Sequence, residues 1–126
     1  MKSRNAATVA LLVLTLAASE VGAAESDEAT RAIARGFAAL RAMDCARCHG
    51  RDFDGWAAPS LTASVREAPR ERFDKWLLDG DIARGMPGYR GQALIEREID
   101  AIYAYLAARA RGEVGAGRLD TGTGTR

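Results

Sequence analysis

The sequence is poor in several residue types on which common sites depend. Its 126 residues include two cysteines and one histidine, and only 6% of the residues are aromatic. Two Cys and one His cannot complete a structural zinc site, which takes about four ligands, unless carboxylates take part. The formal net charge of +1 leaves no basic excess, so a nucleic-acid-binding protein is excluded. The length fits one small domain, and the few aromatic residues predict a thin hydrophobic core.

A long hydrophobic run is also missing. The apolar stretch over residues 6–18 is 13 residues long, whereas a membrane-spanning helix needs about 20. It follows Lys2 and Arg4 and precedes small residues at 21–24, as in a secretory signal peptide. We therefore predict that residues 1–24 are a signal peptide cleaved after Ala23 or Ala24, with export to the periplasm and no stable membrane insertion. A retained membrane anchor is the alternative.

The two cysteines and the histidine form one motif, Cys45-Ala46-Arg47-Cys48-His49. This C-x-x-C-H spacing is typical of c-type haem attachment. Each sulfur can add to one vinyl group of the porphyrin, and His49 can give iron its proximal nitrogen. A dithiol redox site is the alternative, but it is expected beside long apolar strands, which the sequence does not show. The motif predicts one covalently attached haem c.

Three segments have the spacing of helices, namely residues 25–44, 69–79 and 92–111. Ser26 or Asp27 is the expected N-cap of the first. Phe73, Trp76 and Leu77 are expected to share one face of the second. The third carries an apolar stripe formed by Ile95, Ile99, Ile102 and Leu106. We expect an irregular segment over residues 50–68 and a flexible tail over residues 112–126.

A glycine stands in the middle of the first predicted helix. Gly36 costs about 1 kcal/mol there relative to alanine. It either allows another helix to approach closely or is simply tolerated. The small residues of the 92–111 helix make that helix the natural partner.

Met86 is the candidate for a second iron ligand. Gly85 and Pro87 flank it, which places it on a stiff loop rather than in a helix. Met43 stands too close to the cysteines to reach the opposite face of the haem. Met86 is therefore the predicted distal ligand, and an open iron or Lys75 ligation are the alternatives. Ligation by His and Met raises the reduction potential relative to His alone.

Two residues of the 50–68 segment are further candidates for the haem site. Pro59 stands ten residues after His49, and a carbonyl there can accept the Nδ1–H of the imidazole and fix the ring. Trp56 has an indole N–H that can reach a haem propionate. Packing in the core is the alternative for Trp56.

Taken together, the Cys45–His49 motif, Pro59, the Gly-Met-Pro loop at 85–87 and the helix ending at 102–106 resemble a class I c-type cytochrome. The resemblance covers about residues 29–110 and implies a domain over residues 25–111. It implies an all-α fold in which the first and last helices cross nearly perpendicular, with haem held between loops. By position, the resemblance places Gly36, Leu40 and Tyr105 at this crossing.

More narrowly, residues 43–61 and 79–89 are similar to cytochromes associated with quinoprotein (PQQ-dependent) alcohol dehydrogenases. The resemblance implies a periplasmic one-electron carrier and not an enzyme. It would accept electrons from a dehydrogenase and pass them to an oxidase or another cytochrome of the respiratory chain. The alternatives are a cytochrome subunit of a larger oxidoreductase, or a haem enzyme or sensor with an open sixth position. Rim charges that would steer an acidic partner are predicted at Arg47, Arg51, Arg84 and Arg90.

Overall fold

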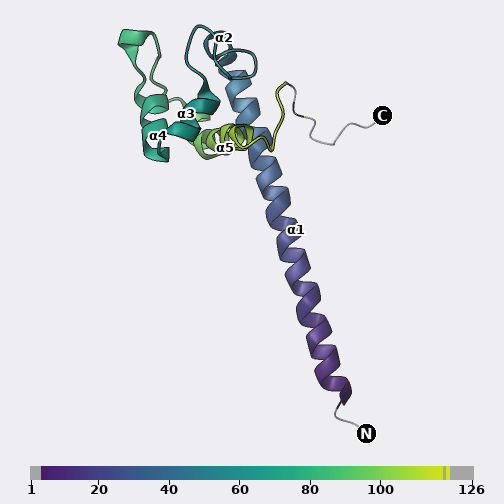
Figure 1. The fold of residues 1–126 in the computed structure, drawn as a ribbon. Helices are drawn as coiled ribbons and strands as arrows, with labels where there is room; N and C mark the ends of the chain where they lie inside the picture. Colours follow the sequence, from purple (N-terminus) through teal and green to yellow (C-terminus); the bar gives the residue numbers. More distant parts are fainter. Residues whose placement is uncertain (1–3, 118, 120–126) are drawn as a thin grey trace. The chain divides into compact units, whose positions relative to one another are not determined.

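The computed structural model describes residues 4–117 and 119, and side chains from residue 22 onward. The chain consists of two compact units, Met1–Arg31 and Ala32–Arg126. In order along the chain the helices are α1 (Arg4–Ala42), α2 (Ala46–His49), α3 (Leu61–Glu67), α4 (Arg70–Asp79), the 3-10 helix η1 (Ile82–Arg84) and α5 (Ala93–Ala110) (Figure 1). Within the described residues the only extended pairing is one isolated bridge, between Asp81 and Met86. The predicted all-α class is confirmed.

Helix α1 begins much earlier than the sequence predicted. It starts at Arg4, so neither Ser26 nor Asp27 is an N-cap in the full chain, and that prediction is wrong. The Ser26 hydroxyl instead donates to the carbonyl oxygen of Ala23 at 2.8 Å, inside the helix. The reason is that the preceding Ala- and Leu-rich residues are good helix formers and extend the helix toward the N-terminus.

None of the helices in the described part of the chain combines the length and hydropathy needed to span a bilayer. The predicted signal peptide, of which residues 1–3 lie outside the described part, remains a prediction.

Helix α3 lies in a segment that the sequence predicted to be irregular. Over residues 61–67 that prediction is wrong. Ser60 caps this helix, because its hydroxyl oxygen accepts the backbone N–H of Ala63 at 3.0 Å. The helix ends before Pro69, which is itself the N-cap of α4. Ser60 thus sets the start of this short helix, and Pro69 follows its end.

Helix α4 buries a narrower face than predicted. Phe73 and Leu77 are 5% and 7% exposed, whereas Trp76 is 43% exposed. The expectation that Trp76 shares the buried face is therefore wrong. With 3.6 residues per turn, Trp76 lies about 100° from Leu77 around the helix, which is outside the stripe that faces the core.

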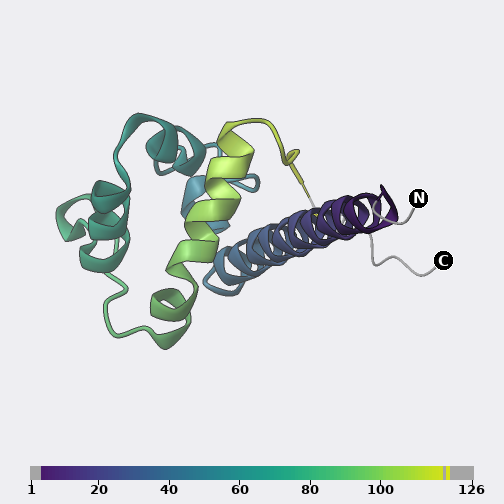
Figure 2. The same ribbon diagram turned by 90° about the horizontal axis from the view of Figure 1, so that it is seen from below.

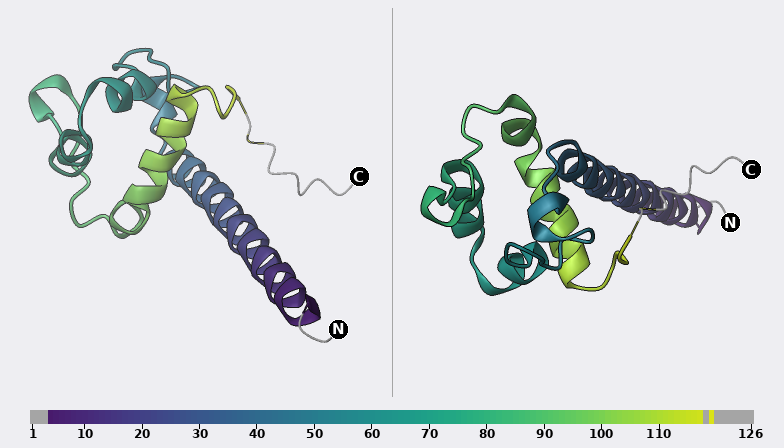
Figure 3. Two further views of the ribbon diagram at one scale, coloured as in Figure 1. Left: turned by 60° about the horizontal axis from the view of Figure 1, so that its bottom comes forward. Right: turned by 90° about the horizontal axis from the view of Figure 1, so that it is seen from above.

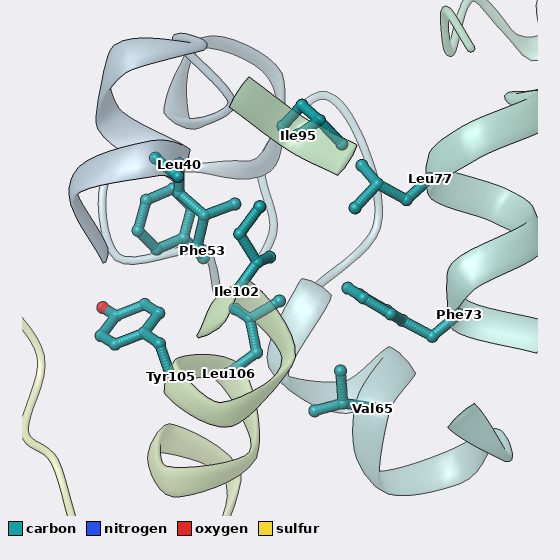
Figure 4. Packing of buried hydrophobic residues seen from close by; sticks show 10 residues of the cluster. Leu40, Phe53, Val65, Phe73, Leu77, Ile95, Ile102, Tyr105 and Leu106 are labelled. Atoms are coloured by element: carbon teal, nitrogen blue, oxygen red, sulfur yellow. The ribbon is translucent and has the colours of Figure 1, made fainter. Parts of the chain in front are cut away.

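The core of the second unit forms around α5. Figures 2 and 3 show α5 between the turns of α1 from Ala32 onward on one side and α3 and α4 on the other. The predicted stripe is present, with Ile95, Ile102 and Leu106 all 0% exposed and Ile99 partly buried. Figure 4 shows Ile95, Ile102 and Leu106 pointing toward residues of the other helices and of the loop after α2. The largest fully buried side chains are Tyr105, Phe53, Leu40, Ile95, Ile102 and Leu106.

A polar and aromatic contact attaches α4 to α5. The Arg70 guanidinium donates to the Asp100 carboxylate at 2.6 Å and lies 4.7 Å from the centre of the Tyr103 ring. The Phe73 and Tyr103 rings pack edge to face with their centres 5.3 Å apart. This contact fixes α4, and with it the start of the loop that carries Met86.

The described part of the predicted flexible tail makes contacts with the rest of the unit. The backbone N–H of Glu113 donates to Ala108 at 2.9 Å, and that of Gly117 donates to the Asp52 carboxylate at 2.8 Å. Val114 packs against the core. Residues 118 and 120–126 lie outside the described residues.

Gly36 allows α5 to approach α1 closely. A Cβ built on Gly36 would lie 2.0 Å from the backbone oxygen of Ala101 and 2.4 Å from its carbonyl carbon. Of the two interpretations of this glycine, close approach is thus the correct one. Leu40 and Tyr105 are buried in the same core, as the family resemblance implies for the crossing of the first and last helices (Figure 1).

We expect Gly36→Ala to lower the free energy of unfolding by more than about 3 kcal/mol, at or above the usual cost of overpacking, because the obstructing atoms are backbone and cannot rotate away. Thermal and denaturant unfolding of the purified protein would measure this loss. Gly115→Ala is the matched control, since a Cβ there meets nothing within 4 Å. Equal stability of the two variants would contradict the role of Gly36.

Candidate functional site

One helical turn brings the two thiols and the imidazole to the same place. Helix α2 covers Ala46–His49, and Cys45, its N-cap, also has helical backbone angles of φ −59° and ψ −30°. Residues at i, i+3 and i+4 of a helix share a face, so Cys45, Cys48 and His49 do so here. Both thiols are free; Cys48 is exposed, and Cys45 is half-buried. The arrangement offers two sulfur atoms and one nitrogen from a single turn.

The environment of Cys45 is unsuited to dithiol redox chemistry. Burial raises the pKa of Cys45 to about 11, and the negative charges of Asp44 and Cys48 act in the same direction. The thiolate is the reactive form, and redox-active cysteines have lowered pKa values. Burial thus disfavours the reactive thiolate form of Cys45.

The imidazole of His49 is fixed by one hydrogen bond. The side chain is 8% exposed, and its Nδ1 lies 2.7 Å from the carbonyl oxygen of Pro59. A carbonyl can only accept, so Nδ1 carries the proton and the neutral ring has its lone pair on Nε2. Within the described residues, no hydrogen bond is made to Nε2. His49 is therefore prepared to bind a metal through Nε2, with Pro59 in the supporting position usual for histidine ligands.

The loop after α2 is closed by its own backbone. We call residues 50–60 the proximal loop. The N–H of Gly55 donates to the carbonyl of His49, and that of Ala58 donates to the carbonyl of Cys48, both at 2.8 Å. These bonds return the chain to α2, which places the Pro59 carbonyl beside the imidazole.

Met86 lies on a loop fixed at several points. The backbones of Asp81 and Met86 exchange two hydrogen bonds of 2.9 Å. The N–H groups of Tyr89 and Arg90 donate to the carbonyls of Leu77 and Leu78 at 3.1 and 3.0 Å. Met86 is half-buried and packs against the hydrophobic core. Its thioether thus comes from a stiff loop, as the flanking Gly and Pro predicted.

Gly80 makes this tight loop possible. Its φ is +72°, and a Cβ there would lie 2.4 Å from the nitrogen of Gly88 and 2.6 Å from the carbonyl oxygen of Met86. The side chains of Arg90 and Asp79 also join the two ends of the loop, with Nε 3.1 Å from the carboxylate. Hydrogen bonding from Arg90 lowers the pKa of Asp79. The backbone near Met86 leaves no room for a side chain at Gly80.

Tyr89 connects the Met86 loop to the cysteines. Burial raises the pKa of Tyr89, and negative charge on Cys45 and Cys48 raises it further. The phenol therefore lies near both thiols, although 40 residues of sequence separate it from His49. The sequence analysis assigned Tyr89 no role in the site. No periodicity or spacing links it to the motif, so only the fold could show this proximity.

The remaining candidate residues lie at the surface. Trp56 is 82% exposed, so packing in the core is wrong for it, and its proposed contact with a propionate remains a prediction. The side chain of Lys75 is 75% exposed and lies 3.6 Å from the Asp79 carboxylate. Arg47 and Arg51 are exposed. Salt bridges to Asp81 and Asp79 occupy the other two predicted rim arginines, Arg84 and Arg90.

The donor set fits a porphyrin that brings its own iron. It consists of two thiols, one imidazole nitrogen and one thioether, which are typical attachments and axial ligands of haem c. No group of three or more His, Cys, Asp or Glu residues that could hold a metal ion occurs within the described residues. A closed zinc site is accordingly not supported there.

Comparison with known proteins agrees with this geometry. The family described as "Cytochrome C oxidase, cbb3-type, subunit III" matches residues 29–106. The chain belongs to the class I c-type cytochromes. Over 113 residues the cytochrome is 33% identical to cytochrome c-555 from Methylococcus capsulatus (Bath), covering 89% of this chain and 88% of the relative. No solved structure matches the cytochrome significantly. Proteins of this kind carry covalently attached haem c and transfer electrons without being enzymes.

We expect Gly80→Ala to move the Met86 loop of the cytochrome and to weaken or abolish the thioether-to-iron charge-transfer band at the red end of the oxidised spectrum. Gly85→Ala is the control. Its φ of +85° imposes a similar backbone strain, but a Cβ there meets nothing within 4 Å. A band of full intensity in Gly80→Ala would show that the loop does not depend on this glycine.

Proposed function

We propose that this protein is a periplasmic one-electron carrier in which Cys45 and Cys48 anchor one haem c, with His49 as the proximal and Met86 as the distal ligand. The observation that supports this most strongly is the hydrogen bond from His49 Nδ1 to Pro59, 2.7 Å long. It leaves Nε2 available to bind iron, within one helical turn of both thiols. When bound, haem c supplies the Fe(III)/Fe(II) couple.

The protein's contribution is to hold both ligands so that they move little. The Pro59 carbonyl fixes the plane and tautomer of the imidazole, and the hydrogen-bonded loop holds the thioether. A methionine in the sixth position leaves no site for oxygen or a substrate. This distinguishes a carrier from a haem enzyme or sensor.

The surface near the motif suits an acidic redox partner. Arg47 and Arg51 flank the exposed Cys48 in sequence and are themselves exposed. Within the described residues neither forms a salt bridge, in contrast to Arg84 and Arg90. Unpaired positive charge increases the rate of encounter with a negatively charged partner. We propose that the donor is a periplasmic dehydrogenase, of which a PQQ-dependent alcohol dehydrogenase is the specific candidate, and that an oxidase or another cytochrome accepts the electron.

A second candidate is a cytochrome subunit held in a larger oxidoreductase. The description of the matching family, an oxidase subunit, favours it. Purification from the native periplasm at low and at moderate salt separates the two candidates. A free carrier elutes as a monohaem protein in both, whereas a subunit stays with its complex at moderate salt. The mass of the mature chain in the same sample shows whether cleavage follows Ala23 or Ala24.

The haem content of the purified protein tests the proposal directly. A pyridine haemochrome assay should give one covalent haem per chain, and the reduced protein should not bind CO. Absence of covalent haem would overturn the proposed function, and ready binding of CO would show an open sixth position.

Met86→Ala should leave haem attached but lower the reduction potential by more than about 59 mV, a tenfold change in the Fe(III)/Fe(II) ratio, because a thioether favours Fe(II). The reduced variant should also bind CO. A redox titration with CO difference spectra measures both effects. Met43→Ala is the control, since Met43 also packs against the core. An unchanged potential in Met86→Ala would remove Met86 from the ligand role.

His49→Ala should prevent haem attachment, because the motif loses the group that binds iron while the thioether bonds form. The yield of covalent haem per chain, measured in exported protein, should fall to near zero. A normal yield of holoprotein would contradict the assignment of His49.

A further inference from the structure

The proximal loop contains a strained residue at its centre. Phe53 has φ +63° and is 0% exposed. Its ring packs edge to face against Tyr105, with centres 5.9 Å apart. A left-handed backbone in a bulky residue is strained and persists only where the surroundings impose it. Two backbone hydrogen bonds hold Phe53 itself: its N–H donates to the Gly50 carbonyl at 3.0 Å, and its carbonyl accepts the N–H of Leu61 at 2.9 Å.

Arg109 of α5 adds contacts to the residues on both sides of Phe53. Its Nη2 donates to the carbonyl of Asp52 at 3.0 Å and to the carboxylate of Asp54 at 2.7 Å. These are the two neighbours of Phe53. The Arg109 side chain is only 7% exposed, and its Nε is buried without a hydrogen-bond partner. A buried N–H without a partner is unfavourable, so solvation at the surface does not explain the position of this side chain.

The polar contacts continue from Asp54 toward the proximal ligand. The hydroxyl of Thr62, which is 8% exposed, donates to the Asp54 carboxylate at 2.7 Å. The same hydroxyl lies 2.9 Å from that of Ser60, which caps α3. Ser60 shares its peptide unit with the Pro59 carbonyl. Contacts between side chains thus connect Arg109 to the acceptor of the His49 hydrogen bond.

We propose that Arg109 is a positioning residue that sets the reduction potential, by holding the Pro59 carbonyl against His49 through Asp54, Thr62 and Ser60. This inference rests on the proposed function, in which His49 binds iron. A firm hydrogen bond from Nδ1 makes the imidazole a stronger electron donor, which favours Fe(III). Loosening the chain of contacts weakens that bond and raises the potential.

The test is a redox titration of the exported holoprotein as Arg109→Met. At a fixed applied potential, the Fe(II)/Fe(III) ratio should rise at least about threefold, or about 28 mV for a one-electron couple, with haem content unchanged. Arg111→Met is the matched control. It removes an arginine two residues away that is 58% exposed and pairs with Glu113. Arg109→Lys should give a smaller shift than Arg109→Met, because a single nitrogen of Arg109 donates both hydrogen bonds and an ammonium can replace it in part.

Thr62→Val keeps the inference testable should Arg109→Met fail to fold. It breaks the same chain of contacts from the other side and should shift the potential in the same direction. In the double variant the two shifts should be less than additive, because each removes the same connection. A lowered melting temperature with an unchanged potential in Thr62→Val or Arg109→Met would assign the network a structural role only and overturn the inference.

Different results would overturn the proposed function and the inference about Arg109. A wild-type protein without covalent haem would end the proposed function. Attached haem with an intact thioether band, together with unchanged potentials in these variants, would end the inference about Arg109 alone.

Discussion

The hydrogen bond from His49 to Pro59 is the constraint on which the site depends. It fixes which imidazole nitrogen is free, and it requires the proximal loop to return to α2 after ten residues. Backbone bonds from Gly55 and Ala58 close that loop at 2.8 Å. The imidazole that we propose as the iron ligand is thus held by a carbonyl whose own position is set by the loop, and the loop is held by α5.

Helix α5 connects the two halves of the site. Its apolar stripe forms the centre of the core (Figure 4), and its Ala101 backbone touches α1 at Gly36. Near its C-terminal end Arg109 holds the proximal loop. Through Asp100 and Tyr103 it also holds α4, from which the Met86 loop begins. A thin core with few aromatic residues can support two ligands because one helix contacts the supports of both.

The predicted rim arginines differ in their salt bridges. Two of the four predicted rim arginines are paired with nearby carboxylates, so Arg47 and Arg51 are the candidates for steering a partner. Exposed salt bridges stabilise a fold by only about 0–1 kcal/mol. These surface salt bridges therefore contribute little to the stability of the fold.

The sequence by itself determined the features that depend on local spacing. The C-x-x-C-H motif, the Met86 loop and the stripe of α5 follow from positions a few residues apart, and from glycine and proline chemistry. The all-α class followed from the family resemblance that these motifs carry.

Tertiary structure decided the features that depend on distant contacts. Only the fold showed that Gly36 meets Ala101, that Trp56 and Trp76 are exposed, and that Tyr89 lies near the cysteines. The contact between Arg109 and Asp54 joins residues 55 positions apart, and no local pattern records it. Burial and pairing of a side chain are set by what the rest of the chain brings against it, whereas periodicity and turn chemistry are set by its immediate neighbours.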